Sequence, residues 1–172
     1  MAARPEDVLA DLAGRAEAVL AVARDNGWTV ATAESLTGGL LTAALVAVPG
    51  ASDVVRGGIT AYQDEVKAQI LGVNAALLER TGPVTAEVAG LMAQGACRVL
   101  GADIGISTTG VAGPASVGDV EPGTAYVAVQ VLGSEPAVRA VRVKGDRTTV
   151  RVRTVVRALE LCEAAIRQSD RP

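Results

Sequence analysis

Hydrophobic residues recur at intervals of three and four in several stretches of the chain, the spacing typical of amphipathic helices. The clearest case lies near the C-terminus, where Val152, Val155, Leu159, Cys162 and Ile166 fall on one helix face. The same periodicity, with Gly and Pro as end signals, predicts further helices over residues 6–25, 40–48, 63–71, 75–80 and 83–100.

Runs rich in valine, alanine and threonine between these stretches predict strands. The best defined is 124–131, in which Val127, Val129 and Val131 share one face. Residues 137–143 alternate poorly, which indicates an edge strand or one covered on both faces. The remaining predicted strands are 28–33, 57–62 and 103–109.

Helices and strands are mixed along the chain, with no internal repeat and no linker. This order favours an α/β fold, a layered sandwich in which a mixed β-sheet is covered by helices. A length of 172 residues fits a single domain over 1–172, with its core at about 6–168. Hydrophobic residues make up 49% of the chain and aromatic residues 2%, so the core must consist of Val, Leu, Ile and Ala.

Charge and hydropathy limit the classes of partner. The net charge of −3 and the pI near 5.0 argue against a nucleic-acid-binding surface. No apolar run approaches the ~20 residues that span a bilayer, so no membrane partner is expected. The first seven residues turn acidic where a signal peptide needs an apolar stretch. We therefore expect a cytoplasmic protein.

Two gaps in the composition restrict the possible chemistry. The chain has no histidine, which excludes a Ser-His-Asp triad and a histidine-ligated metal. Cys97 and Cys162 occupy apolar helical positions without metal or redox spacing, so both are interpreted as buried free thiols. A hydrolase built from this chain must use Lys, Asp, Glu or Tyr as its base. Glu34 and Asp119 are the candidate Mg²⁺ carboxylates, but no clustered acidic motif supports them.

A strand-to-helix junction at residues 32–39 is the first candidate site. Ser35 and Thr37 are followed there by Gly38 and Gly39, so backbone N–H groups at the start of a helix are expected to be free. Such groups suit an anion or a developing oxyanion. The alternative is an ordinary N-cap followed by a glycine turn.

Further candidates lie at the predicted ends of other strands, where ligands bind in open α/β sheets. Tyr62 and Lys67 could reach one point, and a lysine can activate a serine when burial lowers its pKa. The alternatives are a solvated lysine and a tyrosine that packs in the core. Arg147 could meet a phosphate or could simply be a first-turn helix residue.

Taken together, these pieces resemble the C-terminal domain of CinA, the competence-damage-inducible protein. The resemblance covers roughly residues 6–168. It rests on six segments in order: Glu34-Ser35-Leu36-Thr37-Gly38-Gly39, Gly58 with Tyr62 and Lys67, Gly82-Pro83-Val84, Thr109-Gly110-Val111-Ala112-Gly113-Pro114, Pro122-Gly123-Thr124, and Gly145-Asp146-Arg147.

The resemblance implies a nicotinamide-nucleotide amidase, which converts nicotinamide mononucleotide and water to nicotinate mononucleotide and ammonia. It implies Ser35 as nucleophile, Lys67 as its base and Tyr62 as a hydroxyl partner, with no metal and no cofactor. The substrate-binding residues that it implies are Glu34, Thr37, Gly38, Gly39, Thr109, Gly110 and Arg147. A small-molecule nucleotide is then the partner, and apolar edge strands favour a homodimer or higher homo-oligomer.

This mechanism makes specific geometric demands. Lys67 should point towards Ser35 within hydrogen-bond reach, with the Tyr62 hydroxyl nearby. Asp64 should face elsewhere, because an ion pair would raise the pKa of the lysine.

Departures from the family pattern keep other functions open. Residues 115–121 lack the glycine pair and the lysine that relatives often carry in this loop, which affects the expected phosphate affinity. One alternative is a non-catalytic module that binds a nucleotide or a partner and is linked to competence or recombination. Another is a Mg²⁺-dependent phosphohydrolase.

Overall fold

The computed structural model describes residues 5–169 as one α/β domain, so residues 1–4 and 170–172 of the predicted single domain lie outside the described residues. Its helices are α1 (Pro5–Asp25), α2 (Leu40–Val46), α3 (Asp64–Gln69), α4 (Ala75–Thr81), α5 (Ala86–Leu100) and α6 (Arg147–Gln168), with a short 3₁₀ helix, η1 (Ala51–Asp53). Its strands are β1 (Val30–Glu34), β2 (Val55–Thr60), β3 (Ile104–Gly110), β4 (Thr124–Val131) and β5 (Ala137–Arg142).

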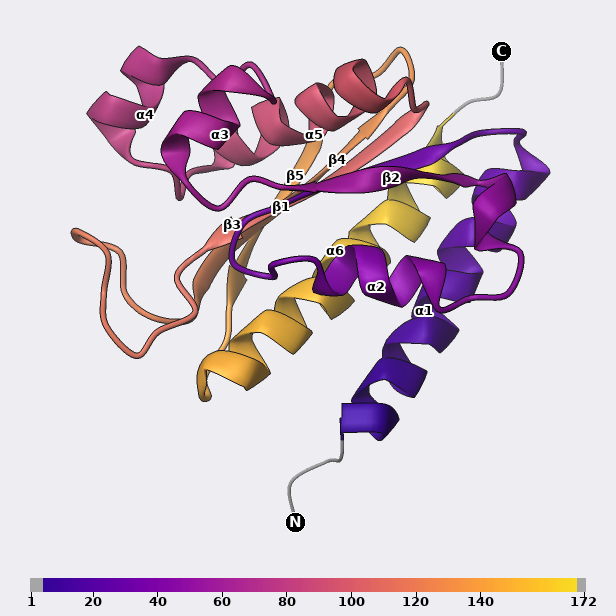
Figure 1. Cartoon of the computed structure of the whole chain (residues 1–172), viewed down its shortest axis with the longest axis horizontal. Helices are drawn as coiled ribbons and strands as arrows, with labels where there is room; N and C mark the ends of the chain where they lie inside the picture. The colour runs from indigo at the N-terminus through magenta and orange to yellow at the C-terminus, as the bar shows by residue number, and fades with distance from the viewer. Residues whose placement is uncertain (1–4, 170–172) are drawn as a thin grey trace.

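The strands form one mixed sheet in the order β2-β1-β3-β4-β5. β1 runs parallel to both β2 and β3, whereas β4 and β5 continue antiparallel to β3. Helices α1, α2 and α6 cover one face, and α3, α4 and α5 lie on the other (Figure 1). This arrangement confirms the predicted layered α/β fold.

The alternation read from the sequence explains the two core layers. Val127, Val129 and Val131 of β4 pack into the large core beneath α1, α2 and α6. Ala128 on the opposite face meets the alanines of α5. Because these contacts use alanine, α5 comes so close to the sheet that a Cβ on Gly105 would collide with the Ala93 carbonyl. Small residues thus replace the missing aromatic side chains.

The predicted elements all appear, with shifted ends. β4 has the predicted bounds, and β5 is an edge strand as expected. The strand predicted over 57–62 instead spans Val55–Thr60, because Val55 already pairs with Val30 of β1. Tyr62 therefore lies beyond the strand and reaches the rim of the sheet. The 3₁₀ helix η1 was not predicted.

The order of connections creates a crevice at one end of the sheet. The chain leaves β1 through α2 on one face, and it enters β3 from α5 on the other face. Such a reversal leaves a gap outside the carboxyl ends of the two strands, where ligands bind in open α/β folds. No helix of residues 5–169 is long and apolar enough to cross a membrane. The homo-oligomer stays a prediction, with β2 and β5 as the two sheet edges.

Candidate active site

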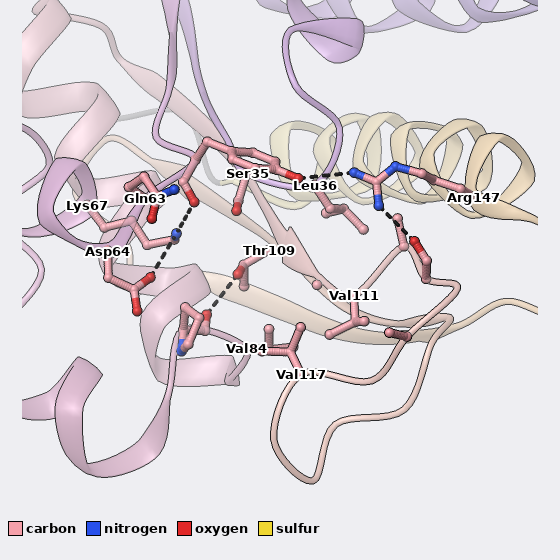
Figure 2. Close-up of a pocket in the computed structure, with 16 residues that line it drawn as sticks. Ser35, Leu36, Gln63, Asp64, Lys67, Val84, Thr109, Val111, Val117 and Arg147 are labelled. Carbon is pink, nitrogen blue, oxygen red and sulfur yellow. Dashed lines mark hydrogen bonds and ion pairs between the residues drawn. The ribbon is translucent and has the colours of Figure 1, made fainter.

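A cavity of about 250 Å³ lies at the carboxyl ends of β1 and β3 (Figure 2). Ser35, Tyr62, Lys67, Thr109, Gly110 and Arg147, all predicted from the sequence, line it. Four of the predicted substrate-binding residues do not: Glu34, Thr37, Gly38 and Gly39. The predicted site residues thus fall into two groups, those that line the cavity and those that do not.

Ser35 is the first residue after β1, a strand buried along its whole length. Its backbone N–H donates to the Thr108 carbonyl at 2.9 Å, which fastens it to the end of β3. The Ser35 residue is 8% exposed, and within residues 5–169 its hydroxyl makes no hydrogen bond. The hydroxyl is therefore available to a ligand in the cavity.

Glu34 is fully buried and serves the start of α2 rather than a ligand. Its Oε2 accepts hydrogen bonds from the Thr37 hydroxyl at 2.7 Å and from the N–H groups of Gly39 and Leu41 at 3.0 Å. Its Oε1 accepts from the Thr42 N–H at 2.8 Å and the Thr42 hydroxyl at 2.6 Å. The expectation of free N–H groups was therefore wrong for Gly39, Leu41 and Thr42, because the preceding glutamate accepts hydrogen bonds from them.

Threonine hydroxyls extend this buried cluster in two directions. Thr37 shares a 2.7 Å hydrogen bond with Thr108, and Thr42 shares one of 2.6 Å with Thr32. A carboxylate only accepts, so if Thr37 and Thr42 donate to Glu34, then Thr108 and Thr32 must donate to them. Glu34 and Thr37 accordingly hold the turn that carries Ser35. We call residues 34–39 the Ser35 segment.

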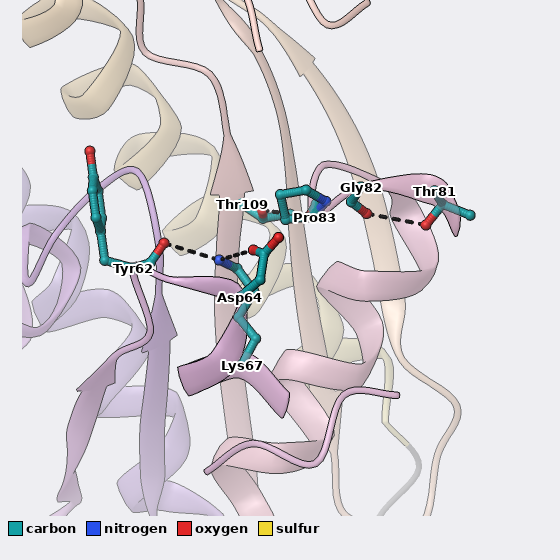
Figure 3. Close-up of polar contacts among 7 residues, drawn as sticks. All are labelled: Tyr62, Asp64, Lys67, Thr81, Gly82, Pro83 and Thr109. Atoms are coloured by element: carbon teal, nitrogen blue, oxygen red, sulfur yellow. Dashed lines mark hydrogen bonds and ion pairs between the residues drawn. The ribbon is translucent and has the colours of Figure 1, made fainter. Parts of the chain in front are cut away.

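Lys67 lies in α3 and is 1% exposed. Its Nζ donates to the Tyr62 carbonyl and to Asp64 Oδ1, both at 3.2 Å (Figures 2 and 3). The prediction that Asp64 faces elsewhere was wrong, because three residues along α3 bring its carboxylate onto the same face as the amine. The predicted hydrogen-bond reach from Lys67 to Ser35 was also wrong, because within the described residues the amine donates to Tyr62 and Asp64 and not to Ser35, although both residues line the cavity. We call residues 62–67 the Lys67 segment.

Tyr62 contributes its carbonyl to Lys67 and its ring to the rim. Figure 3 shows the hydroxyl end of the ring directed away from the lysine amine. This hydroxyl accepts a hydrogen bond of 3.0 Å from Arg147 Nη2, and the residue is 55% exposed. The prediction that the Tyr62 hydroxyl lies near Lys67 was therefore wrong, because the tyrosine side chain extends outwards from the end of the strand.

Arg147 is the first residue of α6 and joins two sides of the cavity mouth. Besides its contact with Tyr62, its Nη1 donates to the Gly113 carbonyl at 2.8 Å. It has no carboxylate partner within residues 5–169. Asp146 caps the same helix, and the hydrogen bond from the Thr149 N–H lowers the pKa of its carboxyl. An exposed cation is thus fixed at the entrance.

Thr109 and Gly110 form the floor at the end of β3. The Thr109 hydroxyl donates to the Pro83 carbonyl at 2.8 Å, so it connects the loop before α5 to the sheet (Figure 3). Gly110 faces β4 so closely that an added Cβ would lie 2.6 Å from the Ala125 Cβ. Both residues line the cavity, Thr109 with its hydroxyl already engaged.

Other residues bear on metal and thiol chemistry. Within residues 5–169 no group of three or more acidic, cysteine or histidine side chains could hold a metal ion, and Asp119 lies on an exposed loop.

Burial raises the pKa of the Cys97 thiol to about 11 and raises that of the fully buried Cys162 further. Both thiols are free, as predicted, although Cys97 is only partly buried.

Sequence reasoning named Asp64 but directed it away from Lys67, and it gave no role at the site to Arg151, which contacts the Ser35 segment. Arg151 donates from Nε to the Leu36 carbonyl at 3.1 Å and from Nη2 to the Thr37 carbonyl at 2.8 Å. The available signal was its spacing, since Arg151 follows Arg147 by one helical turn and must share its face.

Comparisons with known proteins agree on one family. The family model described as the CinA C-terminal domain matches residues 13–166. A CinA-like protein of Frankia casuarinae is 48% identical over 134 residues, which cover 77% of this chain and 30% of that protein. A CinA-like protein of Dictyoglomus turgidum is 38% identical over 146 residues, covering 84% and 35%. The chain thus spans about a third of the length of these curated relatives.

Solved structures agree with the sequence relatives. A competence damage-inducible protein A from Klebsiella pneumoniae superposes with a TM-score of 0.88 at 29% identity, covering 92% of this chain and 99% of that one. The competence/damage inducible protein CihA from Agrobacterium tumefaciens gives 0.85 at 32% identity, covering 98% and 100%. The fold is therefore shared over nearly the whole chain.

Proposed function

The chain belongs to the CinA C-terminal domain family, and from this we propose that it deamidates nicotinamide mononucleotide to nicotinate mononucleotide and ammonia. This family includes nicotinamide-nucleotide amidases. The observation that carries the proposal is the Ser35 hydroxyl, which has no hydrogen-bond partner in residues 5–169 and lines the same cavity as the buried Lys67 amine.

In the proposed reaction Ser35 Oγ attacks the amide carbon and gives up its proton to the neutral amine of Lys67. The tetrahedral intermediate collapses to an acyl-serine, and the proton passes from Lys67 to the departing ammonia. Water then attacks the acyl-serine and gives a proton to Lys67. The acyl C–Oγ bond breaks, Lys67 returns this proton to Ser35 Oγ, and the acid product loses its remaining proton to solvent as the carboxylate. Because the sequence contains no histidine, a serine nucleophile needs another base, and a buried lysine is one that such a site can use.

The contact between Lys67 and Asp64 adds a condition to this mechanism. An opposite charge favours the ammonium form, which cannot accept a proton. Catalysis therefore requires the Lys67 Nζ to leave Asp64 and to form a hydrogen bond to Ser35. The Asp64 side chain is 47% exposed, so water can solvate its carboxylate when the amine moves.

The rest of the cavity supports a nucleotide-like substrate with an aromatic ring. Arg147 supplies a cation without a carboxylate partner in residues 5–169, which suits a phosphate. Val84, Val111 and Val117 form an apolar wall opposite Lys67 (Figure 2), which suits a pyridine ring. Val117 belongs to the 115–121 loop, which lacks the lysine that relatives often carry. This valine can contact the pyridine ring, but it cannot bind the phosphate as that lysine could.

The proposal is tested by measuring ammonia release from nicotinamide mononucleotide by the purified protein, with and without a chelator. We expect turnover in both conditions and none for Ser35→Ala, with an unchanged circular dichroism spectrum. Ser52→Ala, an exposed serine in η1, is the matched control and should keep wild-type activity. Full activity of Ser35→Ala would refute the mechanism, and strict Mg²⁺ dependence would favour the phosphohydrolase instead.

The second candidate is a non-catalytic module that binds a nucleotide. The observation that favours it is the Lys67–Asp64 ion pair, because a protonated lysine contributes charge but not a base. Calorimetric binding of nicotinamide mononucleotide without ammonia release, and unchanged by Ser35→Ala, would support this reading over the amidase.

A further inference from the structure

The guanidinium of Arg151, in α6, contacts the backbone of the Ser35 segment. The two hydrogen bonds to the carbonyls of Leu36 and Thr37 are 3.1 and 2.8 Å long. The side chain is half-buried, and within residues 5–169 it has no carboxylate partner. The planar, permanently charged guanidinium of Arg151 thus donates its hydrogen bonds to two neutral carbonyls next to Ser35.

These contacts set the direction of the backbone after Ser35. In a trans peptide the C=O and N–H bonds point in opposite directions, so a Leu36 carbonyl turned towards α6 turns the Thr37 N–H away from it. The Gly38 N–H donates to the Ser35 carbonyl at 3.1 Å, but the N–H groups of Leu36 and Thr37 have no partner among the described residues. Arg151 therefore controls where an unpaired donor beside Ser35 points.

We propose that Arg151 is a positioning residue, which holds the Leu36 and Thr37 peptides so that the Ser35 hydroxyl and the neighbouring N–H groups keep one geometry. Its role rests on the proposed function, because acyl transfer is the reaction in which such donors stabilise a developing oxyanion. Within the segment the Thr37 hydroxyl donates to Glu34, and a Cβ at Gly38 would lie 3.5 Å from Arg151 Nη2. The guanidinium thus packs directly against the turn.

The first test compares Arg151→Met and Arg151→Lys with Arg153→Met. Arg153 is exposed on the same helix and has no partner in residues 5–169, which makes it a matched control. We expect Arg151→Met to lower kcat about 10- to 100-fold and to change KM less than about threefold, because misplaced N–H donors act on the transition state. Arg151→Lys should lower kcat at least about fivefold, since lysine lacks the rigid planar fork with which arginine reaches both carbonyls from Nε and Nη2.

The second test does not depend on activity. Hydrogen exchange of the amides in residues 34–40 should become faster in Arg151→Met, with exchange in β3 and in Arg153→Met unchanged. Wild-type kcat in Arg151→Lys, or exchange that accelerates equally in β3, would overturn the proposal. An Arg151→Met protein with unchanged kcat, whose loss in kcat/KM comes entirely from a higher KM, would also overturn the proposal. If the wild-type protein released no ammonia, the proposed function would fail, and the exchange measurement would still decide whether Arg151 holds the segment.

Discussion

The Ser35 segment is held from behind by buried groups, whereas the Lys67 segment is held by groups that solvent reaches. Glu34 and Thr37 are fully buried, and Glu34 accepts hydrogen bonds of 2.6–3.0 Å from side chains and backbone. Lys67 is buried as well, but its charged partner Asp64 is half exposed at 3.2 Å. The proposed nucleophile is therefore placed in advance, whereas the proposed base must leave Asp64 before it can act.

The largest expected effect comes from replacement of Lys67, the proposed base. Lys67→Arg should lower kcat about 100- to 10,000-fold, nearly as far as Lys67→Ala, because a guanidinium stays protonated and cannot act as a base. Steady-state ammonia release measures it, with Lys144→Arg, an exposed lysine, as control. An active Lys67→Arg protein would mean that Lys67 contributes charge alone.

Removal of Glu34 tests the fixed side. Glu34→Ala leaves five buried or partly buried donor groups without their acceptor, so the free energy of unfolding should fall by about 3–5 kcal/mol. Urea unfolding followed by circular dichroism measures the change, and Glu79→Ala, on an exposed face of α4, should be nearly neutral. A loss below about 1 kcal/mol would show that the Ser35 segment does not depend on this carboxylate.

Arg147 joins the Lys67 segment to the Gly113 loop, so its loss affects substrate binding more than the nucleophile. A charge-assisted contact to phosphate is worth roughly 1.5–3 kcal/mol, so Arg147→Ala should raise KM about 10- to 100-fold with a smaller effect on kcat. Arg153→Ala is the control on the same helix. Unchanged KM would place the phosphate elsewhere.

The smallest expected effect comes from the ion pair itself. A pair with one half-exposed partner is worth about 0.2–1 kcal/mol, so Asp64→Asn should raise kcat at neutral pH only about 1.4- to fivefold. The substitution removes the ion pair that the Lys67 amine must leave before it can contact Ser35. Glu65→Gln, on the exposed side of α3, should leave kcat unchanged. A lowered kcat would instead show that Asp64 holds Lys67 in its working position.

The fold could be predicted because its elements carry strong local signals. The alternating valines of β4 gave its bounds, and the apolar stripe of α6 identified its buried face. β2 was shifted because its glycines carry no alternation signal. Gly58 is required there by contacts remote in sequence, since a Cβ would collide with the hydroxyls of Thr32 and Thr42.

The segments of the site could also be predicted, but not the partners within it. Glu34 follows a strand and precedes a helix, and nothing local decides whether its carboxylate faces a ligand or folds back. The decision depends on Thr42 in α2, whose N–H and hydroxyl both donate to this carboxylate. Asp64 could be placed on the face of Lys67 by its spacing, but the choice between Ser35 and Asp64 as partner of the amine depends on the three-dimensional distances.

The contact of Arg151 with Leu36 joins residues 115 positions apart in the chain. A ribosome makes the chain from its N-terminus, so β1 and Ser35 leave the exit tunnel long before α6 is synthesised. During that interval the nascent domain carries its serine without the two arginines that contact the Ser35 segment and the cavity mouth. Helix α6 therefore completes, late in the synthesis of this domain, the site that β1 began.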